Sequence, residues 1–149
     1  MISELYKLEK ETLISRLAEF FKTQEHVELA YLFGSTAKDH RGPLSDIDLG
    51  VFLSSSVTKR ERIQKSLEIT AELASFLKTD RIDLVVMNDA SSVINFEIIK
   101  PNIPVFIRDA GFKINIEQEI MSRYLDRRYH ENLLNRVFLE RIQEKGGFE

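Results

Sequence analysis

The chain has 149 residues, a net charge of −3 and no cysteine, and its pI is about 5.7. This length suits one domain spanning residues 1–149, and the lack of thiols excludes disulfides and thiolate metal sites. The acidic balance argues against direct nucleic-acid binding, and with neither a membrane-length apolar run nor a signal-peptide core we expect a soluble, cytoplasmic protein without a membrane partner.

The apolar pattern of the first third predicts one helix and two strands. Residues 3–22 carry apolar side chains at helical spacing among charges, which is typical of an amphipathic helix. Residues 27–33 form an apolar run that predicts a buried strand. Residues 46–53 alternate between polar and apolar at their start and predict a second strand.

A second helix is expected after a polar connection. Thr58 and Glu61 have the spacing of a capping box, in which both side chains satisfy free backbone amides at a helix start. We expect this helix to run to about Leu77. The stripe that should face the sheet consists of Ile63, Leu67, Thr70, Ala71, Ala74 and Leu77.

Further elements follow in the second half of the chain. Residues 81–86 are rich in β-branched side chains and predict a third strand. Residues 91–100 predict a short helix. Pro104 opens an edge strand over residues 105–108, because a missing backbone amide is tolerated at a sheet edge.

The last helix is expected over residues 116–144. Asn115 to Gln118 resembles a capping sequence, and Gly146 follows the helix. Its apolar side chains exceed what one helix against a small sheet requires. Two interpretations stay open, namely packing against the N-terminal helix and an interface with a partner protein.

Together these elements predict an α/β (α+β) fold. The alternation of strands and helices indicates a small mixed sheet of about four strands, with helices mainly on one face and a long C-terminal helix. The other face should stay at least partly open.

A small-residue turn and an acidic pair lie between the first two strands. Gly34 and Ser35 directly follow the first strand, where a tight turn lets backbone amides approach a phosphate. Asp46 and Asp48 alternate with apolar residues, so both carboxylates should point to one face of the second strand. Two such carboxylates repel each other, and a bound cation relieves the repulsion.

Asp83 completes a candidate metal site. A carboxylate inside an apolar strand needs a partner, because an unpaired buried charge costs several kcal/mol. The partner is either Arg81 or a metal ion shared with Asp46 and Asp48. In a two-ion Mg²⁺ site, Asp46 and Asp48 would bridge the ions, and Asp83 would hold the ion nearer the nucleophile.

These residues resemble a known family. Gly34-Ser35, ten intervening residues and Asp46-Ile47-Asp48 resemble the G-S-x10-D-x-D signature of the DNA polymerase β-like nucleotidyltransferase superfamily, with Asp83 as its third acidic residue. The short chain is similar to the minimal nucleotidyltransferase (MNT) branch.

The resemblance implies a polymerase β-like nucleotidyltransferase fold and an antitoxin paired with a helical HEPN-domain toxin. It implies Mg²⁺-dependent transfer of AMP from ATP to a tyrosine of that toxin. Asp46, Asp48 and Asp83 would be the catalytic and metal-binding residues, and Gly34, Ser35 and Arg41 would bind the nucleotide. A solvated loop charge is the alternative for Arg41.

Two other functions stay open at this point. One is nucleotidyl transfer to a small molecule such as an aminoglycoside, which generally requires an added substrate-binding domain. The other is a non-catalytic antitoxin that neutralises its partner by binding alone.

Overall fold

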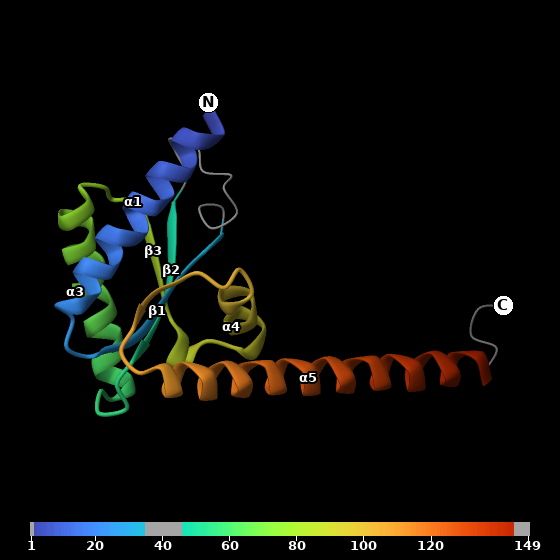
Figure 1. The fold of residues 1–149 in the computed structure, drawn as a ribbon. Coiled ribbons are helices and arrows are strands. Elements are labelled where there is room, and N and C mark those ends of the chain that lie inside the picture. Colours follow the sequence, from blue (N-terminus) through green and yellow to red (C-terminus); the bar gives the residue numbers. More distant parts are fainter. Residues whose placement is uncertain (1, 35–45, 145–149) are drawn as a thin grey trace.

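The computed structural model describes residues 2–34 and 46–144, with side chains from Glu9 onward. Strands and helices are interspersed along the chain (Figure 1). In chain order the elements are α1 (Ile2–Lys22), β1 (Val27–Phe33), β2 (Ile47–Leu53), α3 (Lys59–Leu77), β3 (Ile82–Val86), the 3₁₀ turn η1 (Met87–Asp89), α4 (Ser92–Ile99), β4 (Pro104–Ile107) and α5 (Ala110–Glu144).

The four strands form one mixed sheet in the order β3-β2-β1-β4. β1 is antiparallel to both β2 and β4, whereas β2 and β3 run parallel. Since α3 connects β2 to β3, it provides the crossover that parallel neighbours require. β4 lies at an edge, as the proline that opens it predicted.

Both faces of the sheet carry helices (Figure 1). α1 and α3 cover one face, where their apolar side chains meet alternate residues of the strands. α4 and the first turns of α5 pack on part of the other face. The mixed fold class and the strand count expected from the sequence are therefore confirmed.

The start of α3 is confirmed, but its buried stripe differs from the prediction. The Thr58 side chain accepts from the Glu61 amide, and the Glu61 carboxylate accepts from the Thr58 amide. Ile63 and Leu67 are 63% and 62% exposed, whereas Ile69 and Leu73 are buried. Ile69 and Leu73 each lie six positions after an exposed residue, about 120° around the helix. α3 therefore has two apolar stripes, and the stripe with Ile69 and Leu73 is the one that packs on the sheet.

α5 begins earlier than predicted. Asp109 Oδ1 accepts a hydrogen bond of 2.8 Å from the Gly111 amide, which is the contact that an N-cap side chain makes. The helix therefore starts at Ala110, and the capping-like sequence at 115–118 lies inside it.

A half-buried polar cluster attaches the first turns of α5 to the sheet. The Tyr31 hydroxyl donates to Glu117 Oε1 at 2.5 Å, and Lys113 Nζ lies 2.8 Å from the same oxygen. Burial, reinforced by Glu117, raises the pKa of Tyr31 well above its ordinary value, so the phenol stays protonated and donates. Further along, Tyr124 stacks on Phe96 of α4 with ring centroids 4.0 Å apart.

Within the described ranges, none of the helices combines the length and apolar character needed to cross a bilayer.

We predict that Gly50→Ala destabilises the fold. A Cβ at Gly50 on β2 would lie 2.6 Å from Ile98 Cγ2 and 3.1 Å from Met87 Sδ, so α4 must shift away from the sheet. The expected loss in the free energy of unfolding is about 1–3 kcal/mol, measured by urea denaturation.

Gly111→Ala is the matched control, because its new Cβ meets only Asp109 Oδ1 at 3.3 Å. It should leave stability unchanged or raise it by up to about 1 kcal/mol. Equal stability of the two variants would contradict the close packing of α4 on Gly50.

Candidate active site

Two of the predicted acidic residues are direct neighbours in the sheet. In the β2–β3 register Asp48 lies opposite Asp83, and on its other side Asp48 lies opposite Phe33 of β1. Paired strands lie about 4.8 Å apart. The apolar residues beside Asp48 belong to the core under α1 and α3, so both carboxylates project from the opposite face, the one that carries α4.

Asp46 lies just before β2 and is paired with Arg81. Arg81 Nη1 lies 4.0 Å from Asp46 Oδ1, and the Arg81 carbonyl accepts from the Ile47 amide at 2.9 Å. The ion pair observed for Arg81 is thus with Asp46, whereas one alternative from the sequence placed it with Asp83. Sequence analysis did not place Arg81 in the site. The signal that could have done so is its position directly before β3, the strand that carries Asp83.

The electrostatics of Asp48 reflect its crowded surroundings. Burial first, then the charge of Asp83, then that of Asp46, raise the pKa of Asp48 above its ordinary value. All three effects oppose its ionised form, and a cation at this position would reverse the repulsion between the carboxylates.

Gly34 is required where β1 ends. Its φ of 75° lies in the left-handed region that favours glycine. A Cβ at Gly34 would collide with the carboxylate of Asp48. The glycine at the end of β1 therefore makes room for the acidic side chain of β2.

The remaining predicted nucleotide ligands, Ser35 and Arg41, lie outside the described residues. Among those described, no group of three or more His, Cys, Asp or Glu side chains is arranged to hold a metal ion by itself. Mg²⁺ is usually held by one or two carboxylates together with substrate phosphates. Asp48, with Asp83 beside it and Asp46 close enough to raise its pKa, offers oxygen donors that fit such a substrate-completed site.

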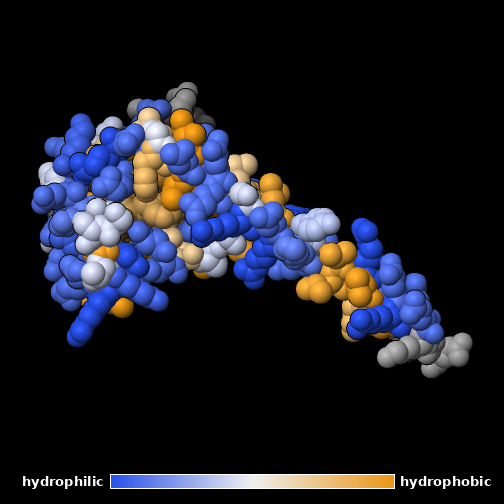
Figure 2. All heavy atoms as spheres, turned by 90° about the horizontal axis from the view of Figure 1, so that it is seen from below, coloured by the Kyte–Doolittle hydropathy of each residue, from blue (hydrophilic) through white to orange (hydrophobic). Residues whose placement is uncertain are grey.

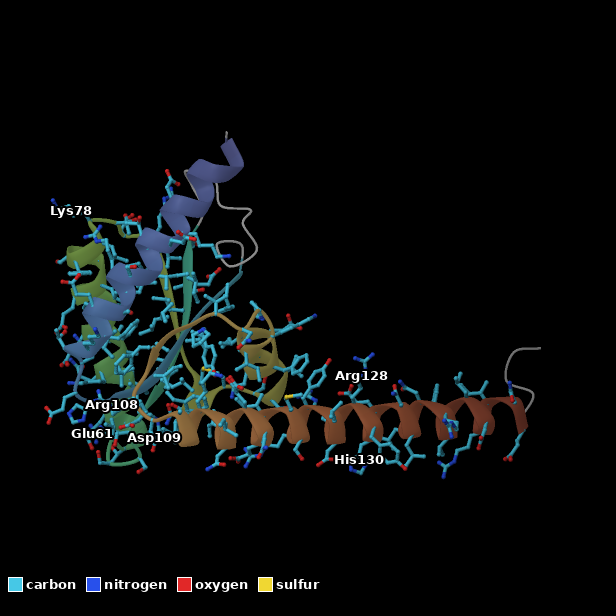
Figure 3. The ribbon with its side chains drawn as sticks, viewed as in Figure 1. Glu61, Lys78, Arg108, Asp109, Arg128 and His130 are labelled. Atoms are coloured by element: carbon cyan, nitrogen blue, oxygen red, sulfur yellow. The ribbon has the colours of Figure 1, made fainter. Side chains whose placement is uncertain are left out.

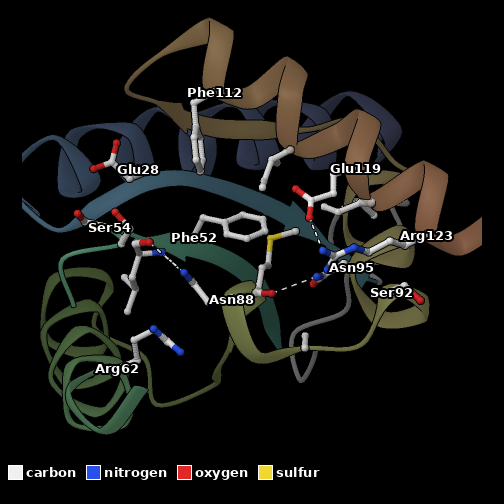
Figure 4. Close-up of a pocket in the computed structure, with 16 residues that line it drawn as sticks. Glu28, Phe52, Ser54, Arg62, Asn88, Ser92, Asn95, Phe112, Glu119 and Arg123 are labelled. Carbon is white, nitrogen blue, oxygen red and sulfur yellow. Dashed lines mark hydrogen bonds and ion pairs between the residues drawn. The ribbon is translucent and has the colours of Figure 1, made fainter. Parts of the chain in front are cut away.

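A cavity of about 680 Å³ lies at the other end of the same sheet face, between β2, η1, α4 and α5 (Figure 4). Asn95 Nδ2 donates to the Met87 carbonyl at 3.0 Å, and Asn95 Oδ1 is buried with no hydrogen-bond partner among the described residues. The cavity lining includes none of the three aspartates. It is therefore separate from the carboxylate cluster.

Most of the chain matches one protein-family model. Residues 15–111 match the model of the family described as polymerase beta, nucleotidyltransferase. No curated protein sequence matches the chain.

Several solved structures share the fold. One is a toxin–antitoxin structure with AMP-PNP, at 20% identity over 84% of this chain and 98% of that one, with a TM-score of 0.66. Another is the toxin–antitoxin MntA-HepT, at 21% identity over 89% and 98%, with a TM-score of 0.59. A third is a tri-AMPylated Shewanella oneidensis HEPN toxin in complex with an MNT antitoxin, at 21% identity over 89% and 98%, with a TM-score of 0.58.

We predict that Gly34→Ala displaces the Asp48 carboxylate and lowers the free energy of unfolding by about 1–3 kcal/mol. Combining it with Asp48→Ala removes the colliding group. The double variant should then be more stable than the sum of the two single effects implies, by at least about 0.5 kcal/mol. Simple additivity in urea denaturation would show that Gly34 and Asp48 do not depend on each other.

Proposed function

Because this chain belongs to the polymerase β nucleotidyltransferase family, we propose that it is an antitoxin that transfers AMP from ATP to a tyrosine hydroxyl of a partner HEPN-domain toxin. The proposal is supported by the solved structures that share its fold. One of them is a toxin–antitoxin structure with AMP-PNP, and another holds a tri-AMPylated HEPN toxin with an MNT antitoxin.

The observation that carries the proposal is the parallel register that sets Asp48 beside Asp83. Asp46, directly before β2, adds a third carboxylate whose charge acts on Asp48. Nucleotidyl transfer moves a highly charged triphosphate next to an attacking hydroxyl, and carboxylate-bound cations are the usual means of stabilising that charge.

Bound Mg²⁺ would neutralise negative charge on the triphosphate and lower the pKa of the attacking hydroxyl. Asp46 and Asp48 would hold the ions, and Asp83 would hold the ion on the acceptor side. The backbone amides at Gly34 and Ser35 would bind triphosphate oxygens, and Arg41 would add a positive charge there.

In the proposed reaction the tyrosine oxygen attacks the α-phosphorus of ATP. A new oxygen–phosphorus bond forms as the tyrosine hydroxyl loses its proton to water, the bond from the α-phosphorus to the bridging oxygen breaks, and pyrophosphate leaves. Asp46, Asp48 and Asp83 would orient the reacting groups, and the lack of a side chain at Gly34 leaves room for the Asp48 carboxylate.

A protein acceptor is favoured over a small molecule by one of the solved structures that share the fold, which holds a tri-AMPylated HEPN toxin in complex with an MNT antitoxin. We propose a cytoplasmic location, because ATP is the co-substrate.

We predict that Asp46→Ala combined with Asp48→Ala abolishes transfer. Incubation with labelled ATP, Mg²⁺ and the product of the neighbouring reading frame should label that protein with the wild type. The double variant should label it at least about 1,000-fold more slowly, which corresponds to roughly 4 kcal/mol of transition-state stabilisation.

Glu11→Ala combined with Glu68→Ala is the matched control, because it removes two exposed carboxylates from α1 and α3. It should label the toxin at the wild-type rate. Undiminished labelling by the aspartate variant would refute the proposal. Full protection of cells by the aspartate variant would show that binding alone neutralises the toxin.

We also predict that Mg²⁺ and nucleotide bind together. Mg²⁺ with AMP-PNP should raise the melting temperature of the wild type, because ligands that bind only the folded state stabilise it. AMP-PNP with EDTA should give little shift, and Asp48→Asn should reduce the shift seen with Mg²⁺. Equal shifts with Mg²⁺ and with EDTA would contradict carboxylate-held Mg²⁺.

A further inference from the structure

The second half of α5 projects away from the rest of the chain (Figure 1). α5 has 35 residues, a length of about 52 Å at 1.5 Å per residue. Ile120 is its last buried residue, and every residue from 125 to 141 is exposed. Arg128 and His130 extend from opposite sides of the helix (Figure 3). This part of α5 therefore meets solvent on all sides.

The end of this projection is strongly apolar. We call residues 133–142 the distal segment, and six of its ten residues are large and apolar. Leu134 is 67% exposed and Phe138 is 63% exposed. The six residues are Leu133, Leu134, Val137, Phe138, Leu139 and Ile142. Figure 2 shows hydrophobic side chains gathered toward the far end of the helix.

These side chains do not form a single stripe. At about 100° per residue they span roughly 240° of the helix circumference. A surface helix normally has an apolar stripe of about 100°, whereas a helix that is apolar around most of its circumference is surrounded by other protein. The distal segment therefore fits a partner that encloses it on more than one side.

A second copy of the chain would cover too little of this surface. One helix lying beside another contacts about half of the six side chains, which bury roughly 60–120 Å² each, or about 180–360 Å² per partner. A stable interface buries about 800 Å² per partner. A groove between two or more helices would bury all six, together with neighbouring parts of α5.

We propose that the distal segment is the docking element for the partner toxin and inserts into an apolar groove between helices of that protein. The inference rests on the proposed function, which supplies a helical HEPN-domain protein as the occupant. Helix-in-groove binding uses anchors at the i, i+4 spacing of Leu134 and Phe138.

The position of α5 suits this role. α5 packs on α4, on the sheet face from which Asp48 and Asp83 project. A toxin held by the distal segment is thus tethered on the same side of the sheet as the carboxylates. Tethering raises the local concentration of the acceptor tyrosine without any new contact at the reacting atoms.

The test changes the distal segment and measures binding separately from transfer. Leu134→Asp combined with Phe138→Asp should weaken binding of the neighbouring reading frame's product at least 100-fold in titration calorimetry, and should raise its KM in the labelling assay. Both side chains are exposed, so the melting temperature should not change. Leu134→Ser combined with Phe138→Ser is a milder second variant that should weaken binding in the same direction.

Ile63→Asp combined with Leu67→Asp is the matched control, since these α3 side chains are 63% and 62% exposed. It should bind and label the toxin as the wild type does. An unchanged Kd for the distal-segment variant would overturn the inference, as would loss of binding in the α3 variant alone. A wild-type dimer that the distal-segment change converts to monomer would also overturn it, because the occupant would then be a second copy.

The docking inference and the proposed function can fail separately. If wild type binds the toxin tightly but never labels it, and the distal-segment variant loses binding, the transferase proposal fails and the docking element stands. If wild type labels the toxin and the distal-segment variant binds equally well, only the docking inference fails. Asp46→Ala combined with Asp48→Ala should bind with the wild-type Kd, which assigns the two roles to different parts of the chain.

Discussion

The parallel pairing of β2 with β3 is the constraint on which the candidate site depends. Asp48 and Asp83 come from segments 35 positions apart in the sequence, and the register makes them neighbours. The same register places the flanking apolar residues in the core under α1 and α3. A slip of one residue would exchange the two faces and bury the carboxylates. Core packing therefore holds like charges together against their repulsion.

The sheet face opposite α1 and α3 is divided into zones. The carboxylates occupy the end where β1 finishes and β2 begins. α4 covers the middle, where the missing side chain of Gly50 lets Ile98 approach the strand. The cavity and the first turns of α5 occupy the other end. The carboxylates and the attachment of the long helix thus lie apart on one surface.

Local patterns in the sequence predicted the strands and the capping box at Thr58, because each depends on neighbouring residues or on strand alternation. Features that depend on tertiary contacts could not be predicted from local patterns. Both apolar stripes of α3 satisfy helical periodicity, and only packing on the sheet decides that Ile69 is buried and Ile63 exposed. The start of α5 was misplaced because Asp109, which caps it, does not belong to a complete capping motif. The sequence showed that α5 carries more apolar side chains than the sheet requires, but it did not show that the second half of the helix projects from the fold.

α5 is attached to the sheet at the polar cluster of Tyr31, Glu117 and Lys113. We call this attachment the pivot, because the rest of the helix projects beyond it. The helix extends roughly 40 Å beyond the pivot, so a rotation of about 5° there would move its tip by about 3.5 Å. Tyr31 lies three residues before Gly34 on β1, and the pivot and the glycine turn thus share one short strand. A displacement of the helix tip would therefore act on the strand that ends beside Asp48 through the hydrogen bond between Tyr31 and Glu117.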